Sequence, residues 1–124
     1  MLANDPATAR FNMIAPQIRP WEVIDERVLH VYEAISRQRF VADENRGLAY
    51  ADIAVPIGEC EQMMKPVQEA RMLQALVVLA DDSVLVIGTG SGFLTACLAQ
   101  LGGIVTSYEI HPTLSESAAQ RLDA

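Results

Sequence analysis

The stretch Val84-Leu85-Val86-Ile87-Gly88-Thr89-Gly90-Ser91-Gly92 decides the fold of this chain. Its four leading apolar residues predict a strand, and the helix-favouring segment 93–101 follows the last glycine. Because no polar residue interrupts the strand, we expect it to be buried on both faces, as in a parallel sheet covered by helices. The alternating glycines carry no Cβ atoms, so the turn between strand and helix can touch what it binds.

A second strand is predicted over 104–110, and it ends in Glu109 and Ile110. Gly88 and Glu109 are separated by about the twenty residues at which a nucleotide-binding βαβ unit places a carboxylate on ribose hydroxyls. Glu109 is therefore the residue expected to accept hydrogen bonds from the ribose hydroxyls. Phe93 stands where a dinucleotide fingerprint has its third glycine, which argues against NAD.

Helices are expected before and after this unit along the chain. Asp25 is a suitable N-cap for a helix over 26–36, and prolines suited to the first helical position open helices at Pro66 and Pro112. An amino-terminal helical segment over 7–18 is either bent or ended by Pro16. We expect a single α/β domain, in which a helical and loop region, 1–65, packs on a partial α/β core, 66–124.

Composition limits the classes of function. The chain has 124 residues, 51% of them hydrophobic, which is enough for one domain. A formal net charge of −7 disfavours nucleic acid and anionic lipid as partners. With no long apolar run, we expect a soluble cytoplasmic protein that does not contact membranes. Cys60 and Cys97 fit neither a disulfide framework nor a metal site, so no metal is expected.

In several motifs the chain resembles the protein-L-isoaspartate O-methyltransferase family. Members of this family are class I methyltransferases that use S-adenosylmethionine. These motifs follow the family's order and spacing across nearly the whole chain. They are Arg10-Phe11-Asn12-Met13-Ile14, Gln17-Ile18-Arg19-Pro20, Asp25-Glu26-Arg27-Val28-Leu29, Leu48-Ala49-Tyr50-Ala51-Asp52, Pro56-Ile57-Gly58, Val84 to Gly92, and Glu109-Ile110.

The resemblance implies a cofactor site and an activity. The loop Gly88-Thr89-Gly90-Ser91-Gly92 would pass under the methionine part of S-adenosylmethionine, Glu109 would hold the ribose hydroxyls, and Ile110 would pack near the adenine. The methyl group would move to the side-chain carboxylate of an isoaspartyl residue in damaged protein, leaving S-adenosylhomocysteine. No residue is assigned to the catalytic step.

The chain departs from the family pattern in two places. Met64 stands where the family has a serine tied to substrate handling, and the neighbouring Lys65 is either an attractor for a substrate carboxylate or a solvated charge. Val86 replaces an acid common in the strand before the glycine loop, which removes a charge near the cofactor. The stretch Met63-Met64-Lys65-Pro66 is similar to a bacterial branch of the family and indicates an altered substrate, whereas Val86 indicates a changed affinity for the cofactor.

Length is the largest departure. The family's sheet has seven strands, and this chain supplies only the first two, so it resembles the first half of a doubly wound parallel-sheet methyltransferase fold. Two parallel strands leave open edges that are prone to pair with another chain. We therefore expect either a truncated chain or a homo-oligomer that shares exposed sheet edges. One alternative function is a non-catalytic remnant that binds the cofactor or only its own copies. A second alternative is a nicotinamide-binding domain, which Phe93 disfavours.

Overall fold

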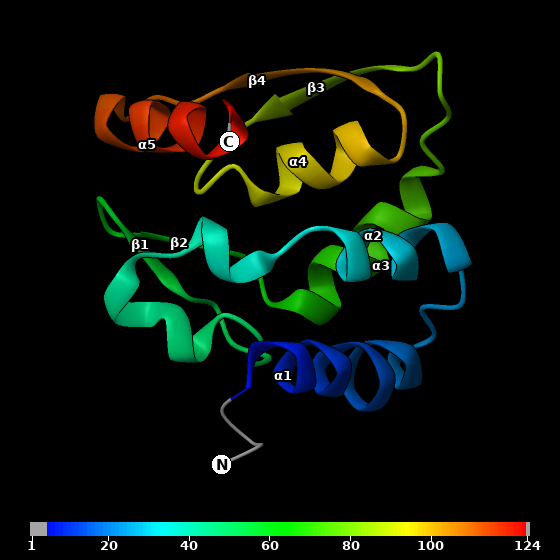
Figure 1. Ribbon diagram of the computed structural model, residues 1–124. Helices are drawn as coiled ribbons and strands as arrows, with labels where there is room; N and C mark the ends of the chain where they lie inside the picture. Colours follow the sequence, from blue (N-terminus) through cyan, green and yellow to red (C-terminus); the bar gives the residue numbers. More distant parts are fainter. Residues whose placement is uncertain (1–4, 124) are drawn as a thin grey trace.

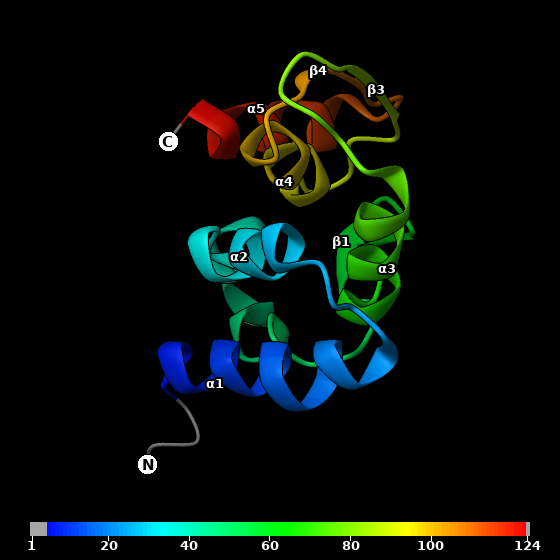
Figure 2. The same ribbon diagram turned by 90° about the vertical axis from the view of Figure 1, so that its right-hand side faces the viewer.

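The computed structural model describes residues 5–123 and arranges them in three tiers (Figures 1 and 2). A helical segment at the amino terminus forms the lowest tier, two helices and a short hairpin form the middle one, and a two-stranded sheet with two helices forms the upper one. The mixed α/β architecture agrees with the prediction from sequence.

The lowest tier begins with α1 (Pro6–Asn12), which Asp5 caps by accepting a hydrogen bond from the Thr8 N–H at 2.9 Å. The chain then widens into a π-helical segment, η2 (Met13–Ile18), and ends in a 3₁₀ turn, η3 (Arg19–Trp21). Pro16 lies inside η2. Because proline has no N–H and its ring crowds the preceding turn, the helix is distorted there without being ended.

The middle tier consists of α2 (Glu26–Ala34) and α3 (Pro66–Leu76), joined by irregular structure. Asp25 caps α2 as predicted, since its carboxylate accepts from the Arg27 N–H at 2.9 Å. The connection contains two 3₁₀ segments, η4 (Arg37–Phe40) and η5 (Asp43–Leu48). It also contains an antiparallel hairpin of β1 (Pro56–Gly58) and β2 (Glu61–Gln62).

The upper tier has the predicted strand, turn, helix and strand. Strands β3 (Ser83–Ile87) and β4 (Ile104–Tyr108) are parallel, with Ser83 opposite Ile104 and Ile87 opposite Tyr108. Helix α4 (Phe93–Gln100) connects them, and α5 (Pro112–Asp123) follows β4. Among residues 5–123, β3 and β4 have no further strand beside them, so both outer edges of this sheet are open.

Burial of β3 on both faces was predicted, and this prediction is wrong. Figure 1 shows α4 and α5 on the same side of the sheet. Only every second side chain therefore faces a helix, such as that of Val86, which is 7% exposed. Apolar side chains on the opposite face are between 61% and 76% exposed, namely those of Leu85, Ile87, Ile104 and Tyr108.

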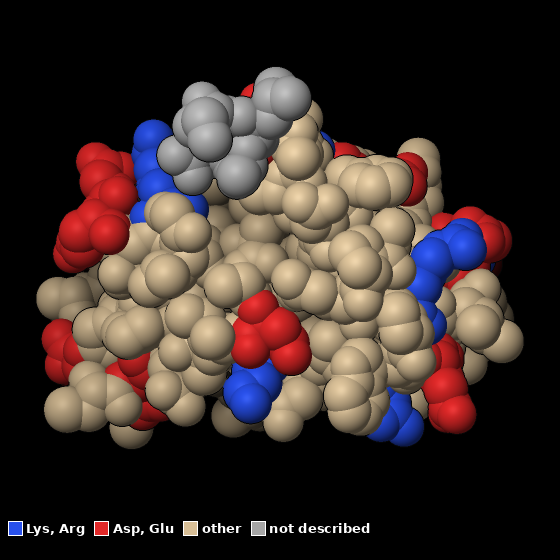
Figure 3. Space-filling model, turned by 90° about the horizontal axis from the view of Figure 1, so that it is seen from below, with Lys and Arg blue, Asp and Glu red and all other residues tan. Residues whose placement is uncertain are grey.

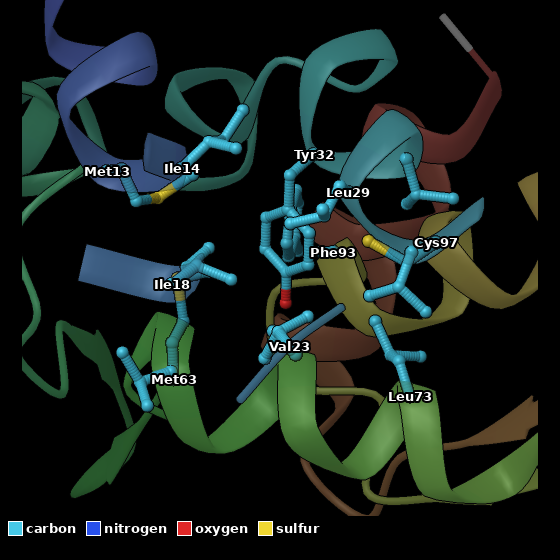
Figure 4. Packing of buried hydrophobic residues seen from close by; sticks show 14 of the residues in the cluster. Met13, Ile14, Ile18, Val23, Leu29, Tyr32, Met63, Leu73, Phe93 and Cys97 are labelled. Carbon is cyan, nitrogen blue, oxygen red and sulfur yellow. The ribbon is translucent and has the colours of Figure 1, made fainter. Parts of the chain in front are cut away.

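The hydrophobic core connects the three tiers and draws on both segments into which the sequence was divided. Figure 4 shows Tyr32 from α2 beside Phe93 from the start of α4, with ring centroids 5.9 Å apart. Cys97 is fully buried, and burial raises the pKa of its thiol well above the ordinary value. Its side chain belongs to the hydrophobic core, together with those of Phe93 and Leu98 from the same helix.

Charged side chains on the lower face are scattered. Figure 3 shows small clusters in which acidic and basic groups lie beside each other, and the mostly uncharged surface between the clusters contains no continuous basic area in this view. Within residues 5–123, no helix is long and apolar enough to cross a membrane.

Candidate functional site

The glycine loop between β3 and α4 takes a backbone conformation that favours glycine. Gly88, Gly90 and Gly92 have φ angles of +94°, +57° and +93°. Space differs along the loop: a Cβ at Gly88 would meet nothing within 4 Å, whereas one at Gly92 would lie 3.2 Å from the Ala118 Cβ. Gly92 thus permits close packing of the loop on α5, whereas the space beside the Gly88 backbone is not filled by other protein atoms.

Hydrogen bonds fix the loop to the carboxyl end of β4. The N–H groups of Gly88 and Thr89 both donate to the Tyr108 carbonyl oxygen, at 2.7 and 3.1 Å. The Thr89 hydroxyl also shares a hydrogen bond with the Ser107 hydroxyl. The carboxyl ends of the two parallel strands therefore meet at one place, where ligands bind in open α/β sheets.

Glu109 lies at this meeting point. Its Oε1 accepts from the Gly90 N–H at 2.8 Å, and its Oε2 accepts from the His111 N–H at 3.1 Å. Desolvation raises the pKa of the Glu109 carboxyl, but these backbone hydrogen bonds outweigh it and hold the pKa below the ordinary value. Glu109 is therefore an ionised acceptor beside the glycine loop at neutral pH.

The β1–β2 hairpin covers the glycine loop. The Ile57 side chain reaches within 3.3 Å of the position that a Gly90 Cβ would occupy. At the tip of the hairpin, Glu59 accepts a hydrogen bond from the Thr113 hydroxyl at 2.9 Å, which joins the hairpin to the start of α5. The hairpin and the loop therefore face each other across the site.

A cavity of about 100 Å³ lies between them. Gly88 to Ser91 line one side of it, and Met63, Met64 and Glu69 line the other. Since ligand pockets commonly measure about 300–1,000 Å³, this cavity can hold one part of a nucleoside-sized ligand. The rest of such a ligand would lie on the surface, where Ile110 is 87% exposed.

Met64 and Lys65, the two candidate substrate residues, differ in their position relative to the cavity. Met64 is 38% exposed and lines the cavity, so the structure brings it to the glycine loop. Lys65 occupies the N-cap position of α3, is exposed, and does not line the cavity.

Sequence reasoning missed Glu69. This residue of α3 is 3% exposed, and its Oε1 accepts hydrogen bonds from the Tyr32 hydroxyl and the Arg37 guanidinium, both at 2.8 Å. Burial raises the pKa of the Glu69 carboxyl, and the Arg37 charge lowers it. The available signal was helical spacing, because Glu69 stands three residues after Pro66 and four before Leu73, which are both buried.

With this geometry established, comparison with known proteins decides the family. The family description "Protein-L-isoaspartate(D-aspartate) O-methyltransferase (PCMT)" matches residues 10–124. The chain belongs to this family. Protein-L-isoaspartate O-methyltransferase 2 of Anaeromyxobacter sp. (strain Fw109-5) is 37% identical over 119 residues, which cover 96% of this chain and 49% of that protein. The methyltransferase of Rhodopseudomonas palustris (strain ATCC BAA-98 / CGA009) is 39% identical over 110 residues, covering 89% and 50%.

Solved structures of the protein-L-isoaspartate O-methyltransferase type share the fold. One from Plasmodium falciparum, in complex with S-adenosyl-L-homocysteine, aligns with a TM-score of 0.78 at 20% identity, covering 97% of this chain and 56% of that one. A second protein-L-isoaspartate O-methyltransferase aligns with a TM-score of 0.78 at 21% identity, covering 92% and 38%. The chain spans about half the length of the curated relatives it matches.

Proposed function

We propose that this chain provides the S-adenosylmethionine-binding part of a protein-L-isoaspartate O-methyltransferase. The single observation that carries the proposal is the hydrogen bond from the Gly90 N–H to the Glu109 carboxylate, at 2.8 Å. It joins the glycine loop and the candidate ribose acceptor at the carboxyl ends of β3 and β4, as a nucleoside site in an α/β sheet requires.

The residues present fit this cofactor. Open space beside Gly88 leaves room for a ligand against the backbone of the loop from Gly88 to Gly92. Glu109 offers carboxylate oxygens to the ribose hydroxyls, which are hydrogen-bond donors. Ile110 presents an exposed apolar side chain that would pack against the adenine. S-adenosylmethionine supplies an electrophilic methyl group on a positively charged sulfur, so the protein mainly has to orient the acceptor and exclude water.

The proposed methyl acceptor is the side-chain carboxylate of an isoaspartyl residue in a protein or peptide. Met64 lies at the cavity, where its apolar side chain would help exclude water. Lys65 is next to it and exposed, so its ammonium group can attract a carboxylate approaching from solvent.

Calorimetry with S-adenosylhomocysteine tests the cofactor proposal. We expect binding by the wild-type chain and its loss in Gly90→Val, because the added side chain would meet Ile57 and a φ of +57° is unfavourable for valine. Gly47→Val is the matched control, since a Cβ at Gly47 would meet nothing within 4 Å. No heat with wild type, or equal heat with NAD, would refute the proposal.

The acceptor needs its own test. A methyl label from S-adenosylmethionine should appear on an isoaspartyl peptide, but not on its aspartyl counterpart, when a longer version of the chain is supplied. Labelling of both peptides, or of neither, would exclude an isoaspartyl-specific activity.

A second candidate function is self-association, and the uncovered face of the β3–β4 sheet favours it. Ile87 and Ile104 are 76% and 68% exposed there, and both edges of this sheet are open among the described residues. Open edges and exposed apolar faces promote pairing with another chain. Light scattering should then show a dimer or larger species that Ile87→Lys converts to monomer, and a wild-type monomer would exclude this function.

A further inference from the structure

Glu69 places a carboxylate in the cavity beneath the glycine loop. It is 3% exposed and shares the cavity lining with Gly88 to Ser91. Of the described residues that line this cavity, Glu69 alone is ionisable, and its neighbours Met63 and Met64 are apolar. A buried carboxylate in such surroundings favours a cationic partner.

The hydrogen bonds of this carboxylate leave one oxygen free. Tyr32 and Arg37 both donate to Oε1, and Oε2 receives no hydrogen bond from the described residues. Arg37 balances the charge without lining the cavity. Arg37 also donates a hydrogen bond to the Met64 carbonyl oxygen at 2.9 Å, and its guanidinium carbon lies 4.8 Å from the centroid of the Phe93 ring.

The strand before the loop provides no such charge. Val86 stands where the family commonly has an acid, and it is apolar and 7% exposed. The methionine part of S-adenosylmethionine carries an ammonium group, which needs an acceptor when it leaves water. On the cavity side of the loop, the acidic acceptor is Glu69, whose carboxyl group pairs with Arg37 at 2.8 Å.

We propose that Glu69 binds the ammonium group of the cofactor's methionine part. It would do so in place of the acidic residue that Val86 replaces in β3. This inference rests on the proposed function, because it assumes that the glycine loop holds the methionine part. The carboxylate that binds the ammonium group would then come from α3 and not from β3.

Two ligands and two variants separate this role from a structural one. S-adenosylhomocysteine contains the amino-acid part, and 5′-methylthioadenosine lacks it. Glu69→Gln should weaken binding of S-adenosylhomocysteine by about tenfold or more, the effect of losing a charge-assisted hydrogen bond, and leave binding of 5′-methylthioadenosine unchanged. Glu116→Gln is the matched control, because it makes the same change at an exposed position of α5 that does not line the cavity. It should bind both ligands as wild type does.

The outcomes are distinct. If Glu69→Gln binds S-adenosylhomocysteine as tightly as wild type, or loses both ligands equally while remaining folded, the inference is overturned and the proposed function stands. If wild type binds neither ligand, both fail. Should Glu69→Gln not fold, Glu69→Asp serves instead, since it keeps the charge opposite Arg37 and withdraws the carboxylate by one methylene. It should selectively weaken S-adenosylhomocysteine, and unchanged selectivity would overturn the inference.

Discussion

Replacing Arg37 by methionine should destabilise the protein strongly and in a pH-dependent way. Arg37 is fully buried, and its guanidinium lies 2.8 Å from the Glu69 carboxylate, which is also buried. Removing one partner of a buried pair leaves an uncompensated charge and costs about 3–5 kcal/mol. Because small domains are stable by about 5–15 kcal/mol, this is a large part of the free energy of unfolding.

The pH dependence follows from Glu69. Burial raises the pKa of its carboxyl, and removing the Arg37 charge, which lowers that pKa, raises it further. A carboxyl whose pKa is higher in the folded than in the unfolded state contributes stability at low pH, and this contribution is lost as the pH rises through the folded-state pKa. The loss in Arg37→Met should therefore be larger at pH 8 than at pH 5.5, changing by about 1.4 kcal/mol per pH unit between the folded-state pKa of wild type and the higher folded-state pKa of the variant.

Urea unfolding followed by far-ultraviolet circular dichroism measures both quantities. Wild type and Arg37→Met are compared at each pH, and Arg39→Met is the control, since Arg39 belongs to the same 3₁₀ segment but is exposed. A loss below about 1 kcal/mol, within the range of an exposed ion pair, would refute the argument that this pair is buried and coupled. So would a loss that grows as the pH falls.

Three further predictions concern the site. Glu109→Gln should weaken S-adenosylhomocysteine binding in calorimetry. The wild-type Glu109 carboxylate contributes stability above its unfolded-state pKa, and this contribution is lost as the pH falls through the lowered folded-state pKa. Glu109→Gln should lack this contribution, and identical acid unfolding curves of wild type and variant would contradict this. Gly88→Ala should lower the free energy of unfolding by about 1–2 kcal/mol, because its φ is +94°, and should abolish S-adenosylhomocysteine binding, whereas an unaltered melting temperature would show that the loop relaxes. Lys65→Ala, assayed in the longer chain, should raise the KM for an isoaspartyl peptide and leave S-adenosylhomocysteine affinity unchanged; an unchanged KM would exclude a role for Lys65 in attracting the acceptor.

Local sequence patterns predicted most of the elements. The apolar run and glycines of 84–92 gave β3, the loop and the start of α4, and Asp25 and Pro66 marked the starts of α2 and α3. The spacing from Gly88 to Glu109 also predicted that the acid would reach the loop, and the structure places Glu109 on the Gly90 N–H. Such features depend on neighbouring residues, so an inspection of the chain detects them.

Only the tertiary structure decided which surfaces are covered and which charges meet. The run Val84 to Ile87 indicated burial on both faces, but α4 and α5 lie on one side and leave Ile87 76% exposed. Arg37 and Glu69 are 32 residues apart in sequence, and no local pattern indicates that they form a buried pair. The physical reason is the same in both cases, because a strand's conformation is set by its own residues, whereas its burial and the pairing of distant charges depend on how separate elements pack together.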